Sequence, residues 1–222
     1  MTEKRKNSSI SVKIRRIGTV SPEPDLIKEA ARVILDGGVI LFPTTCLYGL
    51  GADALNSDAV ERVFAIKHRP YYKPILVLIP STEELNQLVR HVPPAAESLM
   101  RWFWPGRVTI VFHGKDTLPD RLTAGTGKIG VRLPGHPVAA ALLNEVKRPI
   151  TGTSANISGD TGCSRISDLN PDMVEKLDLL LDAGPLKGGI GSTIVDVTED
   201  LPKILREGEV SEKEIFEAIG RQ

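Results

Sequence analysis

The chain has 222 residues, of which 41% are hydrophobic, so it is long enough to bury the core of one large domain. Lysine plus arginine and aspartate plus glutamate both number 28, and the zero net charge excludes a global attraction to nucleic acid or anionic lipid. Any basic site must therefore be local. The two cysteines, Cys46 and Cys163, form no CxxC pair, which argues against a metal knuckle or a disulfide scaffold and fits a reducing compartment.

The two ends of the chain and its hydropathy bear on domain organisation and location. We expect residues 1–9 to be a disordered tail and residues 10–222 to form a single domain. No long apolar run follows the basic N-terminal segment, and no run elsewhere reaches membrane-spanning length. We therefore expect a cytoplasmic protein without membrane contact.

Apolar periodicity assigns alternating strands and helices to the first half of the chain. Ser57 is predicted to cap the second helix, and Pro70 should end that helix near His68. A hydroxyl- and glycine-rich segment over 43–51 is expected to leave the second strand as a loop. The predicted elements are strands over 10–17, 39–42, 75–79 and 108–112, and helices over 26–35, 57–67, 81–89 and 93–103.

The second half of the chain continues the same alternation. Ser211 with Glu214 three residues later predicts a capping box at the start of the last helix. The other predicted elements are strands over 129–133, 149–153, 177–181 and 193–197, a helix over 136–146 and a mobile loop over 159–167. This pattern predicts one α/β domain built around a twisted, mixed β-sheet flanked by helices.

Several catalytic signatures are absent from the sequence. It contains no GxxxxGK[ST] phosphate loop, no GxGxxG after a strand, no HExxH and no GxSxG elbow. Ser154 has no evident histidine or aspartate partner in a known order, which argues against a serine hydrolase.

Cations gather where the second helix should end. Lys67 and Arg69 are two residues apart on a segment that becomes extended, so their side chains can form a doubly positive anion site at an exposed lip. Alternatively, both merely compensate the helix dipole. Arg132 lies within an apolar strand, where a partly buried guanidinium needs a partner or an anionic ligand.

These cations belong to a larger set of polar residues at predicted strand ends, where ligands of open α/β sheets bind. A crevice rich in cations and hydroxyls suits nucleotidyl or phosphoryl transfer better than acid–base catalysis. Taken singly, Thr44 and Ser154 could satisfy turn amides, and Asn156 could be a turn residue. The set comprises Thr44, Thr45, Lys67, Arg69, Arg132, Ser154, Asn156 and Arg206.

In combination, the residues resemble the threonylcarbamoyl-AMP synthase family, the YrdC-type domain in its short form, over about residues 20–219. A Lys-x-Arg and Ser-x-Asn pair is the hallmark of that family. The motifs occur in the family's order: PTTCLYGLG at 43–51, KHRP at 67–70, WPG at 104–106 with Thr109, VRLP at 131–134, TSAN at 153–156, STIVD at 192–196 and LREG at 205–208.

The resemblance implies a YrdC-like fold around a concave basic cavity, and a nucleotidyltransferase reaction. L-threonine, bicarbonate and ATP, the last with Mg²⁺, would give L-threonylcarbamoyladenylate and pyrophosphate. A separate transferase would then modify the adenosine beside the tRNA anticodon, and weak contact with RNA is expected. The implied sites are catalytic Lys67 and Arg69; ATP- or phosphate-binding Lys67, Arg69, Lys128, Ser154, Asn156 and Arg206; threonine-binding Thr44, Arg132 and Thr153; pocket-lining Tyr48; and no protein metal ligand.

The sequence departs from the family pattern at two places. Cys46 stands where many relatives have threonine, and Glu207 stands where proline is common. One alternative is a non-catalytic paralogue that binds RNA or a nucleotide through the same cavity. Another is a module acting on carbamoyl phosphate, as in multidomain hydrogenase-maturation proteins.

Overall fold

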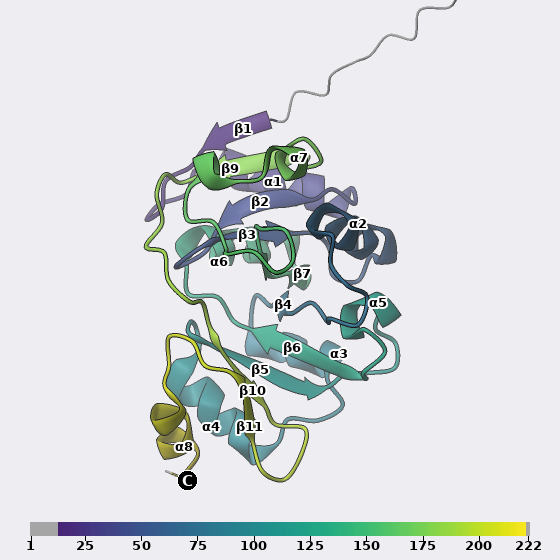
Figure 1. Ribbon diagram of the computed structural model, residues 1–222, viewed down its shortest axis with the longest axis vertical. Coiled ribbons are helices and arrows are strands. Elements are labelled where there is room, and N and C mark those ends of the chain that lie inside the picture. Colours follow the sequence, from purple (N-terminus) through teal and green to yellow (C-terminus); the bar gives the residue numbers. More distant parts are fainter. Residues whose placement is uncertain (1–12, 221–222) are drawn as a thin grey trace, which may run out of the picture.

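The computed structural model describes residues 13–220, which form two mixed β-sheets stacked along the long axis of the molecule (Figure 1). The predicted tail over 1–9 and the start of the predicted strand over 10–17 lie outside the described residues. The predicted α/β domain with mixed strand pairing is confirmed, and its strands are divided between two sheets. Among residues 13–220, no helix has the length and apolar character needed to cross a membrane.

The first sheet has five strands in the order β1-β9-β2-β3-β8. β1 and β2 both run parallel to β9, while β2, β3 and β8 pair antiparallel. Its strands are β1 (Lys13–Arg16), β2 (Ile40–Pro43), β3 (Tyr48–Gly51), β8 (Thr153–Ser154) and β9 (Leu179–Asp182).

The second sheet has six strands in the order β11-β10-β5-β6-β4-β7. β10 is parallel to β5, whereas β5 and β6 are antiparallel. Its strands are β4 (Val77–Leu78), β5 (Val108–His113), β6 (Lys128–Arg132), β7 (Ile150–Thr151), β10 (Thr193–Asp196) and β11 (Lys203–Arg206).

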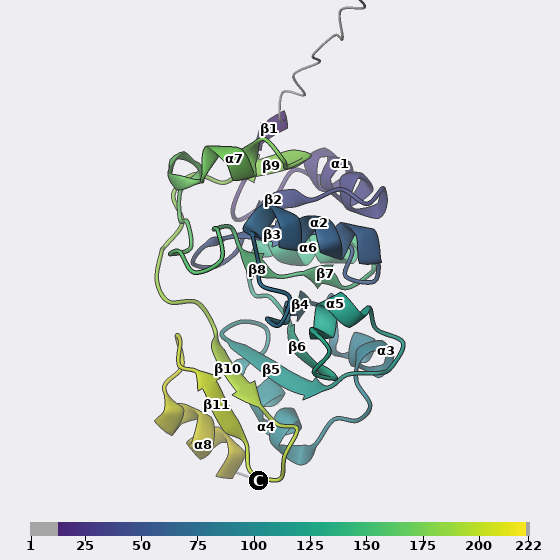
Figure 2. The ribbon, with the colours of Figure 1, turned by 45° about the vertical axis from the view of Figure 1, so that its right-hand side comes forward.

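Helices cover both sheets. α1 and α6 pack against each other beside the five-stranded sheet, and α4 and α8 pack together at the six-stranded sheet (Figures 1 and 2). The helices are α1 (Pro24–Leu35), α2 (Ser57–Lys67), α3 (Leu85–Leu88), α4 (Pro94–Phe103), α5 (Asp120–Thr123), α6 (Pro137–Val146), α7 (Pro171–Val174) and α8 (Glu212–Gly220), with 3-10 turns at Thr82–Glu84 and Ile166–Asp168.

The two-residue period of β2 explains why this strand is buried on both faces. Ile40 and Phe42 belong to the apolar cluster under α1 and α6, whereas Leu41 points into the larger cluster on the opposite face. An uninterrupted apolar run is what a strand between two cores requires.

The chain crosses between the two sheets at Gly152. β7 pairs with β4 of the six-stranded sheet, and β8 pairs with β3 of the five-stranded sheet (Figure 2). A Cβ at Gly152 would lie 2.6 Å from Leu76 Cδ1 and 2.7 Å from Leu78 Cγ, so a larger residue would collide with this wall. The single strand predicted over 149–153 is therefore two short strands.

Other differences from the sequence-based expectations are local. The segment over 43–51 contains β3, because Tyr48–Gly51 pairs with β2 instead of forming a loop. Only Val77 and Leu78 of the predicted strand over 75–79 pair as a strand. The predicted capping box is present, since the Ser211 amide donates to Glu214 Oε2 at 3.0 Å and the Glu214 amide donates to Ser211 Oγ at 3.4 Å.

The N-cap of α2 is Asn56 rather than Ser57. Its side-chain oxygen accepts hydrogen bonds from the amides of Asp58 at 3.0 Å and Ala59 at 3.2 Å. Two otherwise unpaired helix donors are thereby satisfied.

We predict that Asn56→Ala lowers the free energy of unfolding by about 1 kcal/mol, because both capping bonds are lost. Asn56→Asp, which keeps the acceptor, should retain nearly all of the stability. Urea unfolding followed by circular dichroism measures both, and equal loss in the two variants would contradict the capping role.

Candidate active site

A cavity of about 470 Å³ lies where the two sheets meet. The β2–β3 loop and β8 contribute one wall, and the six-stranded sheet contributes the floor. The segment between β9 and β10, which connects the sheets, contributes Ile190 and Gly191 to the remaining wall.

Strand periodicity builds the floor. Along β5, Val108, Ile110 and Phe112 point into the core, and the residues between them face the cavity. β6 and β10 follow the same rule, so each strand has one apolar face and one cavity face. The floor residues are Thr109, Val111, Lys128, Gly130, Arg132, Ile194 and Asp196.

Arg69 faces the cavity from the turn after α2, as the sequence predicts. Its Nε donates to the Lys73 carbonyl at 3.0 Å, and one terminal nitrogen donates to the Pro74 carbonyl at 2.7 Å. These two bonds anchor the guanidinium to its own turn. The remaining N–H groups are available to an anion in the cavity.

Arg132 and Arg206 approach the cavity from β6 and β11. Each is oriented by one backbone carbonyl: Arg132 Nε donates to Gly106 at 2.5 Å, and a terminal nitrogen of Arg206 donates to Ser192 at 2.7 Å. Burial lowers the pKa of both guanidiniums from their ordinary value. An anionic ligand would offset that desolvation, which makes both residues suitable for anion binding.

Lys67 does not stand at an exposed lip, so that expectation is wrong. The side chain is only 1% exposed, and its ammonium donates to the carbonyl of Ser154, to the carbonyl of Asn156 at 2.8 Å and to Asn156 Oδ1 at 3.5 Å. His68 adopts a left-handed conformation (φ 48°) that ends α2 and separates the directions of Lys67 and Arg69. Lys67 therefore fastens the helix end to the loop after β8.

Asn156 belongs to the same buried junction and is not part of the cavity wall. Its Oδ1 accepts from Ser154 Oγ at 2.5 Å, and its Nδ2 donates to the carbonyls of Ile157 at 2.7 Å and Asp160 at 2.9 Å. Ser154 does line the cavity. Of the predicted Lys-x-Arg and Ser-x-Asn pair, Arg69 and Ser154 thus face the cavity, while Lys67 and Asn156 support them from behind.

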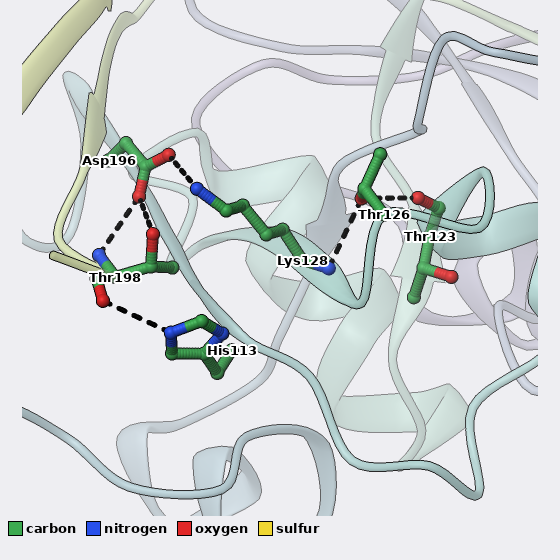
Figure 3. Close-up of polar contacts among 6 residues, drawn as sticks. All are labelled: His113, Thr123, Thr126, Lys128, Asp196 and Thr198. Atoms are coloured by element: carbon green, nitrogen blue, oxygen red, sulfur yellow. Dashed lines mark hydrogen bonds and ion pairs between the residues drawn. The ribbon is translucent and has the colours of Figure 1, made fainter.

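Lys128 also lines the cavity, where it pairs with a carboxylate (Figure 3). Its Nζ lies 2.9 Å from Asp196 Oδ2, and Asp196 Oδ1 accepts from the Thr198 amide at 2.9 Å and the Thr198 hydroxyl at 2.6 Å. The Thr198 carbonyl in turn contacts His113 Nε2 at 3.0 Å. Burial acts to raise the pKa of Asp196, but the bonds from Thr198 and Lys128 outweigh it and leave the pKa below its ordinary value.

The remaining predicted residues all line the cavity. Thr44 donates its hydroxyl to the Leu47 carbonyl at 2.6 Å, which leaves the oxygen able to accept a bond, and Thr153 lies on β8. Tyr48 directs its hydroxyl to the Gly184 carbonyl at 2.7 Å, where burial raises its pKa to about 12. Tyr48 thereby secures the segment that connects the sheets.

The sequence-based set omitted several cavity residues. Asp196 is the last residue of the STIVD motif, and Glu209 directly follows the LREG motif. Their position at these motifs is the sequence signal that could have identified them as cavity residues. The other polar side chains that line the cavity and were omitted from that set are Cys46, Thr109, Thr126, His136 and Ser192. Among residues 13–220, no group of three or more His, Cys, Asp or Glu residues could hold a metal ion.

Comparison with known proteins places this geometry in a family. The family model described as Telomere recombination, that of the Sua5, YciO and YrdC proteins, matches residues 32–208. The chain belongs to this family. A Sua5/YciO/YrdC structure, that of Pyrococcus abyssi Sua5 complexed with L-threonine, matches it with a TM-score of 0.88 at 37% identity, covering 93% of this chain and 61% of that one.

Curated Sua5/YciO/YrdC relatives are named threonylcarbamoyl-AMP synthases, which is the family that the sequence motifs resemble. The threonylcarbamoyl-AMP synthase of Pyrococcus abyssi is 38% identical over 194 residues, which cover 87% of this chain and 57% of the relative. That of Bacillus subtilis is 36% identical over 195 residues, covering 87% and 56%. The chain spans little more than half the length of these relatives. The predicted family and its YrdC-type α/β fold are confirmed.

We predict that Lys67→Met lowers the free energy of unfolding by about 1–3 kcal/mol, because it leaves buried carbonyls without a donor. Arg69→Met is the matched change two residues away, and it should cost less than about 1 kcal/mol because its acceptors are exposed. Unfolding in guanidinium chloride measures the stability of both variants. Equal stability of the two would contradict the buried junction.

The stability difference between wild type and Lys67→Met should also depend on pH. Burial, followed by repulsion from Arg69, lowers the pKa of Lys67 from 10.5 to about 7. Between these values the unfolded state binds more protons, so the wild type should gain stability relative to the variant as pH rises from 7 to 9.5. If the stability difference does not change between pH 7 and pH 9.5, Lys67 stays protonated over this range, held by its hydrogen bonds to the carbonyls.

Proposed function

We propose that this chain makes L-threonylcarbamoyladenylate and pyrophosphate from L-threonine, bicarbonate and ATP. The observation that carries the proposal is one cavity that brings together three guanidiniums, Lys128 and hydroxyl groups in a Sua5/YciO/YrdC chain. Its structural similarity to Sua5 complexed with L-threonine supports an amino acid as one substrate. The names of the curated relatives support the adenylate as product.

The reaction needs clustered positive charge and exclusion of water. The threonine amine and bicarbonate form a carbamate and release water; a carbamate oxygen then attacks the α-phosphorus, and the bond to pyrophosphate breaks. The carbamate decomposes unless it reacts promptly, so holding both reactants in one cavity favours transfer. Charge grows on the leaving pyrophosphate, and preorganised guanidiniums stabilise it.

We assign residue roles as the motif resemblance implies them, to residues that line the cavity. Phosphates are assigned to Arg69, Lys128, Ser154 and Arg206, and threonine to Thr44, Arg132 and Thr153, with Tyr48 in the wall. In this proposal Lys67 and Asn156 act through Ser154, since their polar groups are used in the buried junction. Lys128 must leave Asp196, or share its protons with it, to reach a phosphate.

The wider setting is part of the same proposal. Mg²⁺ enters with the phosphates of ATP as part of that substrate, and no protein ligand is assigned to it. A separate transferase that acts on tRNA would consume the adenylate, with weak RNA contact by this chain and a cytoplasmic location.

The proposal is tested with pure protein, ATP, labelled bicarbonate and L-threonine. Pyrophosphate release that requires both bicarbonate and L-threonine, together with a labelled adenylate, is the expected result. Nucleotide binding without threonine-dependent pyrophosphate release would contradict it and favour the non-catalytic paralogue.

We predict that Arg69→Ala lowers kcat/KM for ATP by about 10- to 100-fold, the loss expected when a bond from a charged donor is removed. Arg62→Ala, on the helix that precedes Arg69, is the control, because Arg62 pairs with Asp178 at 2.9 Å and does not line the cavity. Equal loss of activity in both variants would contradict a direct role for Arg69.

A further inference from the structure

Two carboxylates, Asp196 and Glu209, are the acidic groups among the described residues that line the cavity. Both oxygens of Asp196 are occupied, one by Thr198 and the other by Lys128 (Figure 3). Asp196 therefore orients a cation and offers little to a ligand. Glu209, in the loop between β11 and α8, is arranged differently.

Three contacts position Glu209. Its Oε1 accepts from Cys46 Sγ at 3.2 Å and lies 3.7 Å from Lys187 Nζ, and its amide donates to the Gly191 carbonyl at 3.0 Å. The side chain is 14% exposed, whereas Lys187 is 74% exposed. Oε2 has no partner within residues 13–220, so one oxygen of an oriented carboxylate is left for a donor in the cavity.

The thiol of Cys46 acts as a fixed donor in this arrangement. Burial, followed by the hydrogen bond to Glu209, raises the pKa of Cys46 to about 11. The thiol thus keeps its proton at neutral pH and holds Oε1.

Glu209 lies at the arginine-rich end of the cavity. Burial lowers the pKa of Arg132, and the negative charge of Glu209 opposes that shift. The phosphates of a nucleotide, which carry negative charge and no donor, gain nothing from a carboxylate here. An α-amino acid carries an ammonium and a carboxylate on one carbon, and it needs an acidic acceptor next to a guanidinium.

We propose that Glu209 binds the α-ammonium group of the amino-acid substrate through Oε2, while Arg132 binds the α-carboxylate. Cys46 is a positioning residue that acts through Glu209. The assignment rests on the proposed function for the identity of the amino acid, and it accounts for a carboxylate in a cavity otherwise suited to anions.

The test compares binding of L-threonine with that of (2S,3R)-2,3-dihydroxybutyrate, in which a hydroxyl replaces the amine, by isothermal titration calorimetry. We expect the wild-type chain to prefer threonine, and Glu209→Gln to lose about 10- to 100-fold in threonine affinity with little change for the analogue. Glu207→Gln is the matched control, because Glu207 is exposed, accepts from the Glu212 amide at 3.2 Å and does not line the cavity.

The outcomes separate the two proposals. If wild type binds threonine and Glu209→Gln retains both its affinity and its preference over the analogue, the role of Glu209 is overturned while the proposed function stands. If wild type does not bind threonine under any assay condition, the proposed function fails and the assignment fails with it. Glu209→Asp keeps the negative charge but shortens the side chain, so it should also weaken threonine binding. This variant replaces Glu209→Gln in the test if Glu209→Gln does not fold.

Discussion

The two-residue period of the six-stranded sheet is the constraint on which the site depends. The same strands that bury Ile110, Val131 and Val195 in the core must turn their alternate residues to the opposite face. In the register of β5 with its neighbours, Val111 lies between Gly130 and Asp196, so Lys128 reaches Asp196 across β5. A one-residue slip would bury these charges and expose the core, which is why fold and site are specified together.

Behind the cavity wall, a buried cation organises the loop that carries Ser154. An ammonium group that is removed from water is costly unless acceptors replace the lost hydration. The carbonyls of Ser154 and Asn156 supply them, and Asn156 in turn holds Ser154 Oγ. Lys67, one cation of the motif, therefore holds the loop in place, whereas the guanidinium of the other, Arg69, faces the cavity.

Much of the fold and part of the site could be read from the chain alone. Helical and alternating apolar periods located α1, α2, α4, α6 and most strands, because amphipathic periodicity is a local signal. The short strand β3 was missed since Tyr48–Gly51 has no such period and is held in place by β2. The predicted strand ends and the motif resemblance both indicate Arg69, Arg132, Ser154 and Arg206, and all four line the cavity.

The sequence by itself determined the α/β class, the family and several of the cationic and hydroxyl residues that line the cavity, because these depend on local periodicity and on motifs in order. Only the tertiary structure decided how those residues divide their work. Lys67 points into the buried junction and Arg69 towards the cavity, because the left-handed His68 turns the chain between them. The two-residue spacing of the cations does not encode that turn. Cys46 meets Glu209 across 163 residues of sequence because loops from different sheets converge on one cavity.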